Sequence, residues 1–188
     1  MNRRDALKRT TFLLGGTLSA SAIMGVMSGC KAEPTLNWTP SFFTIEEGNI
    51  VEQIADRIIP RTDTPGAIDG GVHTFIDKMM AGYYSEEDRL AFREGLKKVD
   101  EDAKSEFGKT FISLTAEQQD EFLKKYDALA YEETTGPDHF FKTMKELTIL
   151  GFCTSETGAT EFLKYDPLPG DYKGCIPYSE VGGAWATH

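Results

Sequence analysis

Apolar residues recur every three or four positions through most of the chain, which is the spacing of a buried helical face. The first such stretch begins at Thr44, with a glutamate three residues later as in a capping box, and Pro60 ends it. The second covers residues 72–83, where the neighbouring Met79 and Met80 are interpreted as core filler. The pattern predicts two helices joined by a loop rich in glycine and proline.

Three further helices and a short sixth are expected downstream. Acidic residues open the third helix after Ser85, and Gly108 ends it. Thr115 is the expected N-cap of the fourth helix and Asp138 that of the fifth, which carries large apolar side chains along its length. The sixth covers residues 159–163. Because the alternation typical of strands is almost absent, the predicted fold class is all-α, a single domain of about five to six helices.

Residues 164–188 differ in character from the helical part. Their prolines and glycines forbid long regular structure, yet their aromatic residues are too apolar for a disordered tail. An irregular segment of this kind needs a surface to lie on. That surface is either the chain's own helical core or another protein.

The first 29 residues follow the order of an export signal, with a basic head, an apolar stretch and small residues before a cysteine. Arg3 and Arg4 stand in a context that resembles a twin-arginine motif. Residues 26–30 are similar to a bacterial lipobox, in which Cys30 would carry the lipid and become the mature N-terminus. The alternative is an amphipathic helix with an accidental arginine pair. The expected organisation is a signal peptide over 1–29, a lipidated tether over 30–43 and a helical domain over 44–188.

Charge narrows the range of partners. The chain has 20 Lys and Arg against 30 Asp and Glu, and removal of residues 1–29, which hold four basic residues and one acidic residue, leaves 16 against 29. Such an acidic body lacks the concentrated positive charge of a nucleic-acid-binding protein, so no nucleic acid partner is expected. Acyl chains on Cys30, rather than the body, would hold the protein on the periplasmic face of a bacterial membrane.

The body contains no dinucleotide fingerprint, Walker loop or nucleophile elbow, so no catalytic, cofactor-binding or metal-binding residue is assigned. His73, His139 and His188 are far apart in sequence and are expected to be caps or surface residues. Cys153 and Cys175 would lie in an oxidising compartment, where a disulfide and two buried free thiols are both open. The twin-arginine route carries folded proteins, so an exported chain without a cofactor motif fits an escort of a cofactor-loaded partner.

Several short motifs carry a family resemblance, and most lie in the C-terminal third. They are GFCTSE at 151–156, YDPLPGDY at 165–172, GCIPY at 174–178, GAW at 183–185, and ADRIIP at 55–60 with TPG at 64–66. Together they resemble the gluconate 2-dehydrogenase subunit 3 family over about residues 44–185. These motifs look like structural loops rather than catalytic signatures, so they indicate the family without indicating a substrate.

The resemblance implies a non-catalytic small subunit of an exported dehydrogenase that oxidises a sugar or sugar acid. FAD is expected in a large partner subunit of the glucose-methanol-choline type and no cofactor in this chain, with a cytochrome c subunit or another membrane acceptor receiving the electrons. The small subunit would support folding, export and membrane attachment of the flavoprotein. Tyrosine and tryptophan are favoured interface anchors, so the expected partner contacts are Tyr165, Tyr172, Tyr178 and Trp185. The alternative is an independent lipid-anchored envelope protein that binds a carbohydrate or another envelope protein.

Overall fold

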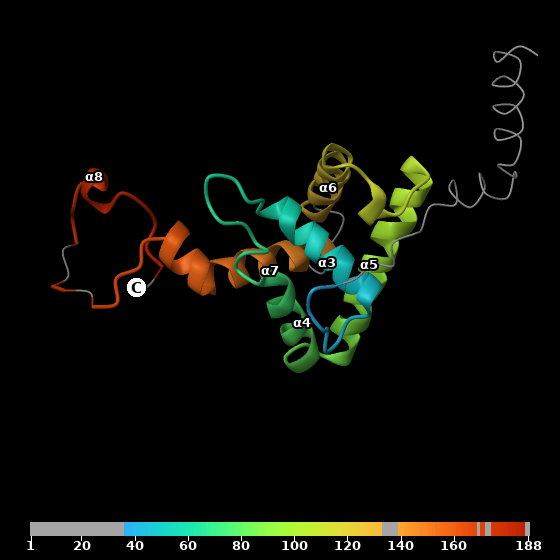
Figure 1. The fold of residues 1–188 in the computed structure, drawn as a ribbon, viewed down its shortest axis with the longest axis horizontal. Helices are drawn as coiled ribbons and strands as arrows, with labels where there is room; N and C mark the ends of the chain where they lie inside the picture. The colour runs from blue at the N-terminus through green and yellow to red at the C-terminus, as the bar shows by residue number, and fades with distance from the viewer. Residues whose placement is uncertain (1–35, 133–138, 169, 172–173, 187–188) are drawn as a thin grey trace, which may run out of the picture. The chain divides into compact units, whose positions relative to one another are not determined.

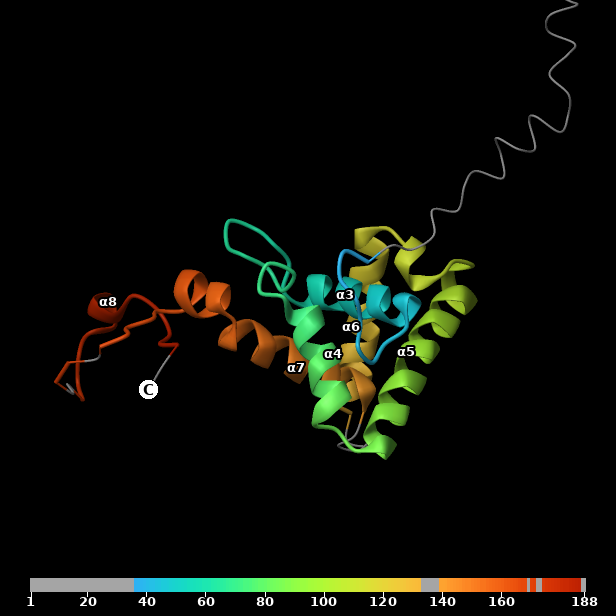
Figure 2. The same cartoon turned by 60° about the horizontal axis from the view of Figure 1, so that its bottom comes forward.

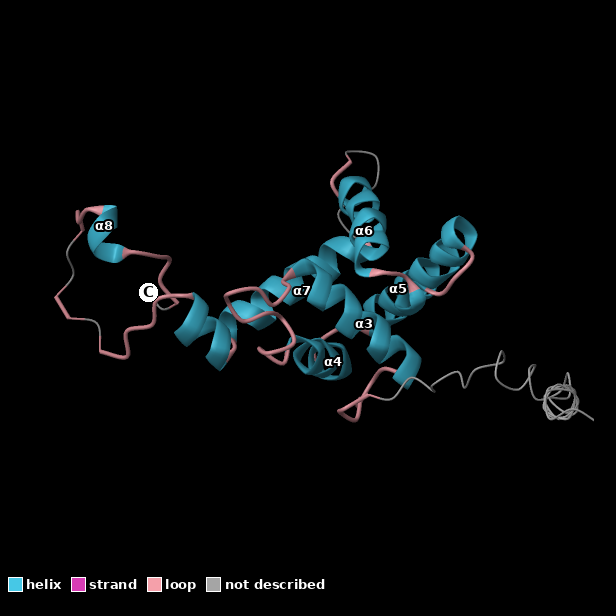
Figure 3. Cartoon of the chain, turned by 45° about the horizontal axis from the view of Figure 1, so that its top comes forward, coloured by secondary structure: helices cyan, strands magenta, loops and turns pink. Residues whose placement is uncertain are grey.

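The computed structural model describes residues 36–132, 139–168, 170–171 and 174–186. Within these ranges the secondary structure is helical, and Figure 3 shows helices and loops without a strand. The helices, labelled as in Figure 1, are α3 (Ile45–Ile58), α4 (Val72–Gly82), α5 (Glu86–Phe107), η1 (Phe111–Ser113), α6 (Ala116–Ala130), α7 (Phe140–Thr154), η2 (Gly158–Phe162) and α8 (Tyr178–Val181). The predicted all-α fold class is confirmed, and the expected sixth helix is the π-helical turn η2.

Local capping interactions explain why the helices begin where they do. The Thr44 and Thr115 side chains both form capping boxes, at the starts of α3 and α6, and Ser85 accepts a backbone hydrogen bond at the start of α5. Asp138, predicted to cap α7, lies outside the described residues. The N-cap of α7 is His139, whose Nδ1 accepts the backbone N–H of Phe141 at 3.3 Å.

The hydrophobic core lies around α3, which contacts α4, α5, α6 and α7 (Figure 2). Fully buried side chains come from each of these helices: Val51 and Ile54 from α3, Ile76 and Met80 from α4, Leu96 and Val99 from α5, Phe122 from α6, and Met144 from α7. Met79 also packs against this core, so the interpretation of the methionine pair as core filler is confirmed.

Three leucines of the predicted helices are exposed: Leu90, Leu129 and Leu150. Leu90 and Leu150 lie on the opposite sides of α5 and α7 from the buried residues, at 3.6 residues per turn. Leu129 lies in the last turn of α6, at the edge of the buried stripe. Helix α7 therefore carries apolar side chains outside its core-facing side as well as on it.

Close packing of helices α5 and α7 depends on a glycine. A Cβ atom added to Gly95 of α5 would overlap the ring of Phe140 at the start of α7. The absence of a side chain at this position thus lets the Phe140 ring approach the α5 backbone, where it also meets the Phe92 ring edge-on at 4.9 Å between centroids.

The segment before α3 is packed on the helices. The Asp77 carboxylate of α4, which is 2% exposed, accepts the backbone N–H groups of Ser41, Phe42 and Phe43 at 2.7, 3.0 and 3.0 Å. Nη2 of Arg93 donates to the Phe42 carbonyl at 2.6 Å. Part of the predicted tether, residues 36–43, is therefore a strap held across the domain, while residues 30–35 lie outside the described part of the chain.

Candidate partner interface

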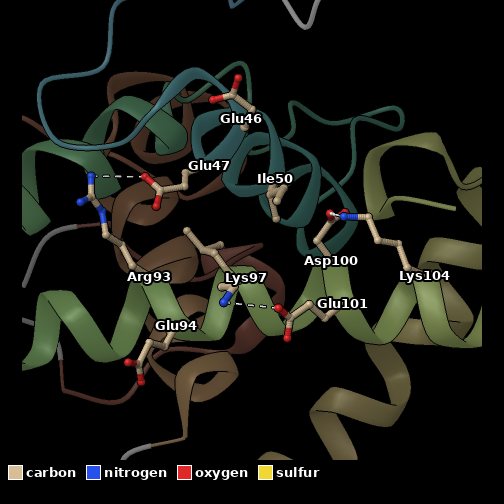
Figure 4. A pocket seen from close by; sticks show the side chains of 10 residues that line it. Glu46, Glu47, Ile50, Arg93, Glu94, Lys97, Asp100, Glu101 and Lys104 are labelled. Carbon is tan, nitrogen blue, oxygen red and sulfur yellow. Dashed lines mark ion pairs between the residues drawn. The ribbon is translucent and has the colours of Figure 1, made fainter. Parts of the chain in front are cut away.

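One surface groove is lined mainly by charged side chains, many of which form ion pairs. It has a volume of about 400 Å³ and lies between α3 and α5 (Figure 4). Its cations face carboxylates of the same groove: Arg93 with Glu47 at 3.3 Å, Lys97 with Glu101 at 3.4 Å, and Lys104 with Asp100 at 2.5 Å. Each cation of the groove is thus paired with a carboxylate, and the lining offers no cysteine, serine or histidine nucleophile.

Two of the three histidines, His73 and His139, contact neighbouring elements of the fold. His139 caps α7, as expected for a cap residue, and burial lowers its pKa, with nearby Lys98 acting in the same direction. His73 packs against Trp38 of the strap, with ring centroids 5.2 Å apart. Burial lowers the pKa of His73, and the charge of Glu52 opposes this effect. The third histidine, His188, lies outside the described residues.

Two kinds of site or segment are absent from the described ranges. No group of three or more His, Cys, Asp and Glu side chains in these ranges is placed to hold a metal ion. No helix in the same ranges is both long and apolar enough to span a bilayer.

Helix α7 carries apolar side chains on two sides. One side packs into the core through Met144, Thr148 and Phe152, all fully buried. On the other side, Ile149 and Leu150 are about half exposed. A helix that is apolar on both sides usually has a neighbour on each of them. The outer side of α7 is therefore a candidate contact surface, and the adjacent apolar pair at 149 and 150 was the signal in the sequence.

The segment after η2 also leaves apolar side chains exposed. The largest exposed fractions are 86% for Leu168 and 78% for Tyr178, and Tyr165 and Ile176 are exposed to smaller extents. Among the described residues, the buried core takes none of its members from beyond Phe152. The described aromatic residues of this segment thus do not join the buried core of the helices, which favours another protein as the surface that they contact.

The four predicted interface aromatics separate into different roles. Tyr165 and Tyr178 are exposed and open to contact, whereas Tyr172 lies outside the described residues. Trp185 forms an isolated parallel bridge with Lys164, and its ring lies 4.5 Å below the Lys164 ammonium group. Trp185 therefore closes the C-terminal segment on itself, a role that the sequence pattern did not indicate.

Cys153 and Cys175 are both free thiols in the structure. Cys153, on the outer side of α7, is half-buried, and Cys175 is exposed. Both thiols are thus free, as in the alternative to a disulfide, but neither is buried. The disulfide is not formed here and stays a prediction for an oxidising compartment. The predicted lipidation residue Cys30 and the signal residues Arg3 and Arg4 lie outside the described part of the chain.

Comparison with known families decides what kind of protein carries this surface. The family model described as gluconate 2-dehydrogenase subunit 3 matches residues 45–170, from the first residue of α3 to the loop after η2. The chain belongs to this family. The family name denotes one subunit of a dehydrogenase, so the chain is a component of a multi-subunit dehydrogenase complex. Neither the comparison with curated proteins nor that with solved structures gave a significant match.

The extent of the family match also corrects the expected range. The resemblance was expected to continue to about residue 185, but the family model ends at residue 170. Tyr165 and Leu168 lie inside the match, together with the outer side of α7. Tyr178 and Trp185 lie beyond it, so their contribution to a partner interface rests on this chain's own structure.

Proposed function

We propose that this chain is the non-catalytic small subunit of an exported, FAD-dependent dehydrogenase that oxidises a sugar or sugar acid. The supporting observation is an exposed apolar surface, on α7 and in the segment after η2, in a chain that belongs to a family of dehydrogenase subunits. FAD belongs to the large partner subunit in this proposal, and a cytochrome c subunit or another membrane acceptor takes the electrons. The role of the chain is to assist folding and export of the flavoprotein.

The proposed location follows from the N-terminal motifs. Arg3 and Arg4 direct the chain into the twin-arginine route, and lipid on Cys30 attaches it to the periplasmic face of a bacterial membrane. Only five residues lie between Cys30 and Leu36, where the described strap begins, so a lipid on Cys30 keeps Leu36 within about 20 Å of the lipidated residue. A flavoprotein bound to this domain thereby becomes membrane-associated without a spanning helix of its own.

Purification of the tagged chain from its native host in mild detergent tests this function. The expected result is a yellow complex with flavin absorption bands and a second, larger polypeptide at constant ratio. A matched preparation of the Cys30→Ser variant is expected to give the same yellow complex from the soluble fraction, because partner binding and lipid attachment use different parts of the chain. A colourless chain that reproducibly lacks a large partner would refute the proposal and favour an independent envelope binding protein.

A further inference from the structure

The sequence motif at residues 55–60 builds part of a cavity that the proposed function does not use. Ala55 is fully buried, whereas Arg57, Ile58 and Pro60 line a cavity of about 320 Å³. The rest of the lining comes from α6 and from the first two turns of α7, so three helices meet around it. All of the lining lies in the described part of the chain and inside the family match at 45–170.

The inner side of this cavity is apolar. Leu123 and Phe141 line it and are only 6% and 3% exposed, and the half-buried Ile58 joins them. Pro60, two residues after the end of α3, is exposed and completes the apolar lining. A recess of this kind suits one apolar side chain of another protein, because anchors seated in such pockets account for much of the binding energy of an interface.

The outer part of the cavity is charged. Three cations and two carboxylates line it: Arg57, Lys124, Lys145, Asp120 and Asp127. This balance is the reverse of that of the whole chain, which has 30 acidic and 20 basic residues. Nζ of Lys145 donates to Asp127 at 2.6 Å, whereas the exposed Lys124 forms no ion pair with any residue that the structure describes. Lys124 is therefore available to a carboxylate of a partner.

Arg57 has hydrogen-bonding capacity that its present contacts leave unused. Its guanidinium pairs with Asp56, and its Nη1 lies 3.9 Å from Asp120, beyond hydrogen-bond distance. Its Nε is buried and has no partner among the described residues, which is unfavourable for an N–H donor. A carboxylate brought in by a partner would be a stronger acceptor for the guanidinium than Asp120 at this distance. The outer part of the cavity thus favours an anionic group.

We propose that this cavity is a docking pocket for the FAD-binding large subunit, and that it receives a segment in which an apolar side chain lies next to an aspartate or glutamate. The inference rests on the proposed function, since that function supplies the partner. The apolar side chain fills the recess formed by Leu123 and Phe141, and the carboxylate pairs with Lys124 and Arg57. The charge pair orients the partner and speeds its association, while the apolar side chain supplies most of the affinity.

Photo-cross-linking in the native host identifies the occupant of the pocket. With a photoreactive amino acid in place of Lys124, the full tagged chain is expected to cross-link to the large subunit. Mass spectrometry of the linked peptide is expected to show an apolar residue beside an aspartate or glutamate. The matched control carries the photoreactive amino acid in place of Lys78, an exposed lysine of α4 outside the cavity, and is expected to give no link to that peptide.

Competition during co-expression measures the contribution of the charge. A tagged variant and the untagged wild-type chain compete for the large subunit, and mass spectrometry gives the ratio of the two chains in the flavin-containing complex. Lys124→Glu is expected to compete about tenfold less well, because it brings like charges together, and Lys124→Gln about threefold less well. Lys78→Glu is the control and is expected to compete like the wild type. Exchange of the cross-linked carboxylate of the large subunit for lysine is expected to restore binding of Lys124→Glu.

The outcomes distinguish the pocket from the function itself. If the wild-type chain binds the flavoprotein but Lys124→Glu competes as well as Lys78→Glu, the docking pocket is refuted and the proposed function survives. A linked peptide without an acidic residue refutes the pocket in the same way, and so does a small carboxylic acid that native mass spectrometry finds bound to the wild type and absent from Lys124→Glu. If the wild-type chain binds no flavoprotein, the proposed function fails and the pocket loses its partner with it.

Discussion

The strap before α3 is expected to depend on Asp77. Its carboxylate is 2% exposed and accepts three consecutive backbone N–H groups, from Ser41, Phe42 and Phe43. The Oδ1 atom accepts two of them and Oδ2 the third, from Ser41 at 2.7 Å. Replacement by alanine removes all three acceptors. Replacement by asparagine keeps one oxygen, which can still accept from Phe42 and Phe43, and places an N–H₂ group against the Ser41 donor.

These contacts set the size of the expected effect. A hydrogen bond to a charged group contributes about 1.5–3 kcal/mol to stability. The Ser41 and Phe42 amides are only partly buried, however, and can donate a hydrogen bond to water when the carboxylate is removed. The buried Phe43 amide cannot. We therefore expect Asp77→Ala to lower the free energy of unfolding by about 3 kcal/mol and Asp77→Asn by about 1–2 kcal/mol. For a domain of this size the alanine variant should melt about 6–12 °C lower.

Two probes follow the strap and the helices separately. Trp38 contacts His73 and donates to Glu52 at 3.1 Å, so tryptophan fluorescence in a Trp185→Phe background reports on the strap, whereas far-UV circular dichroism reports on the helices. Urea titration of the full chain in mild detergent gives the unfolding free energy. Asp171→Asn, an exposed carboxylate outside the helices, is the control. The proposed role of Asp77 is refuted if Asp77→Ala has the same midpoint of urea unfolding as the wild type. It is also refuted if the asparagine variant is as unstable as the alanine variant.

Three further predictions concern packing, pH and location. Gly95→Ala should destabilise the domain by about 1–3 kcal/mol because the new Cβ overlaps Phe140. Gly82→Ala, with no heavy atom within 4 Å of its new Cβ, should instead stabilise the domain by up to about 1 kcal/mol. Equal melting temperatures of the two variants would contradict this prediction. Burial lowers the pKa of His73 in the folded state, so protons bind the unfolded chain preferentially and stability should fall as the pH drops below about 6.5. His73→Gln should reduce this loss between about pH 7.5 and pH 5.5 in urea titrations, and an unchanged difference between the two pH values would count against it. Cys30→Ser should move the protein from the membrane to the soluble periplasmic fraction, and membrane retention on cell fractionation would show that lipid is not the anchor.

The helical elements of this protein are determined by local features of its sequence. At three helix starts, the side chain of the N-cap residue accepts one backbone N–H of the first helical turn; these residues are Thr44, Ser85 and Thr115. A short stretch of sequence therefore suffices to locate each start. The end of α5 at Gly108, which adopts a φ of 68°, is equally local. The all-α class follows from these elements, and the family resemblance follows from short loop motifs that a sequence displays directly.

The tertiary structure alone decided the features that depend on residues far apart in the chain. Strap residues 41–43 are held by a carboxylate more than 30 residues away, and Trp185 is paired with Lys164 across the C-terminal loop. Periodicity defines which residues share a side of a helix, but not which sides have a neighbour, and so it does not show that Leu150 is exposed. The exposed side of α7 and the contact between Lys164 and Trp185 follow only from the packed structure, because burial and long-range contacts are properties of the folded chain and not of a segment.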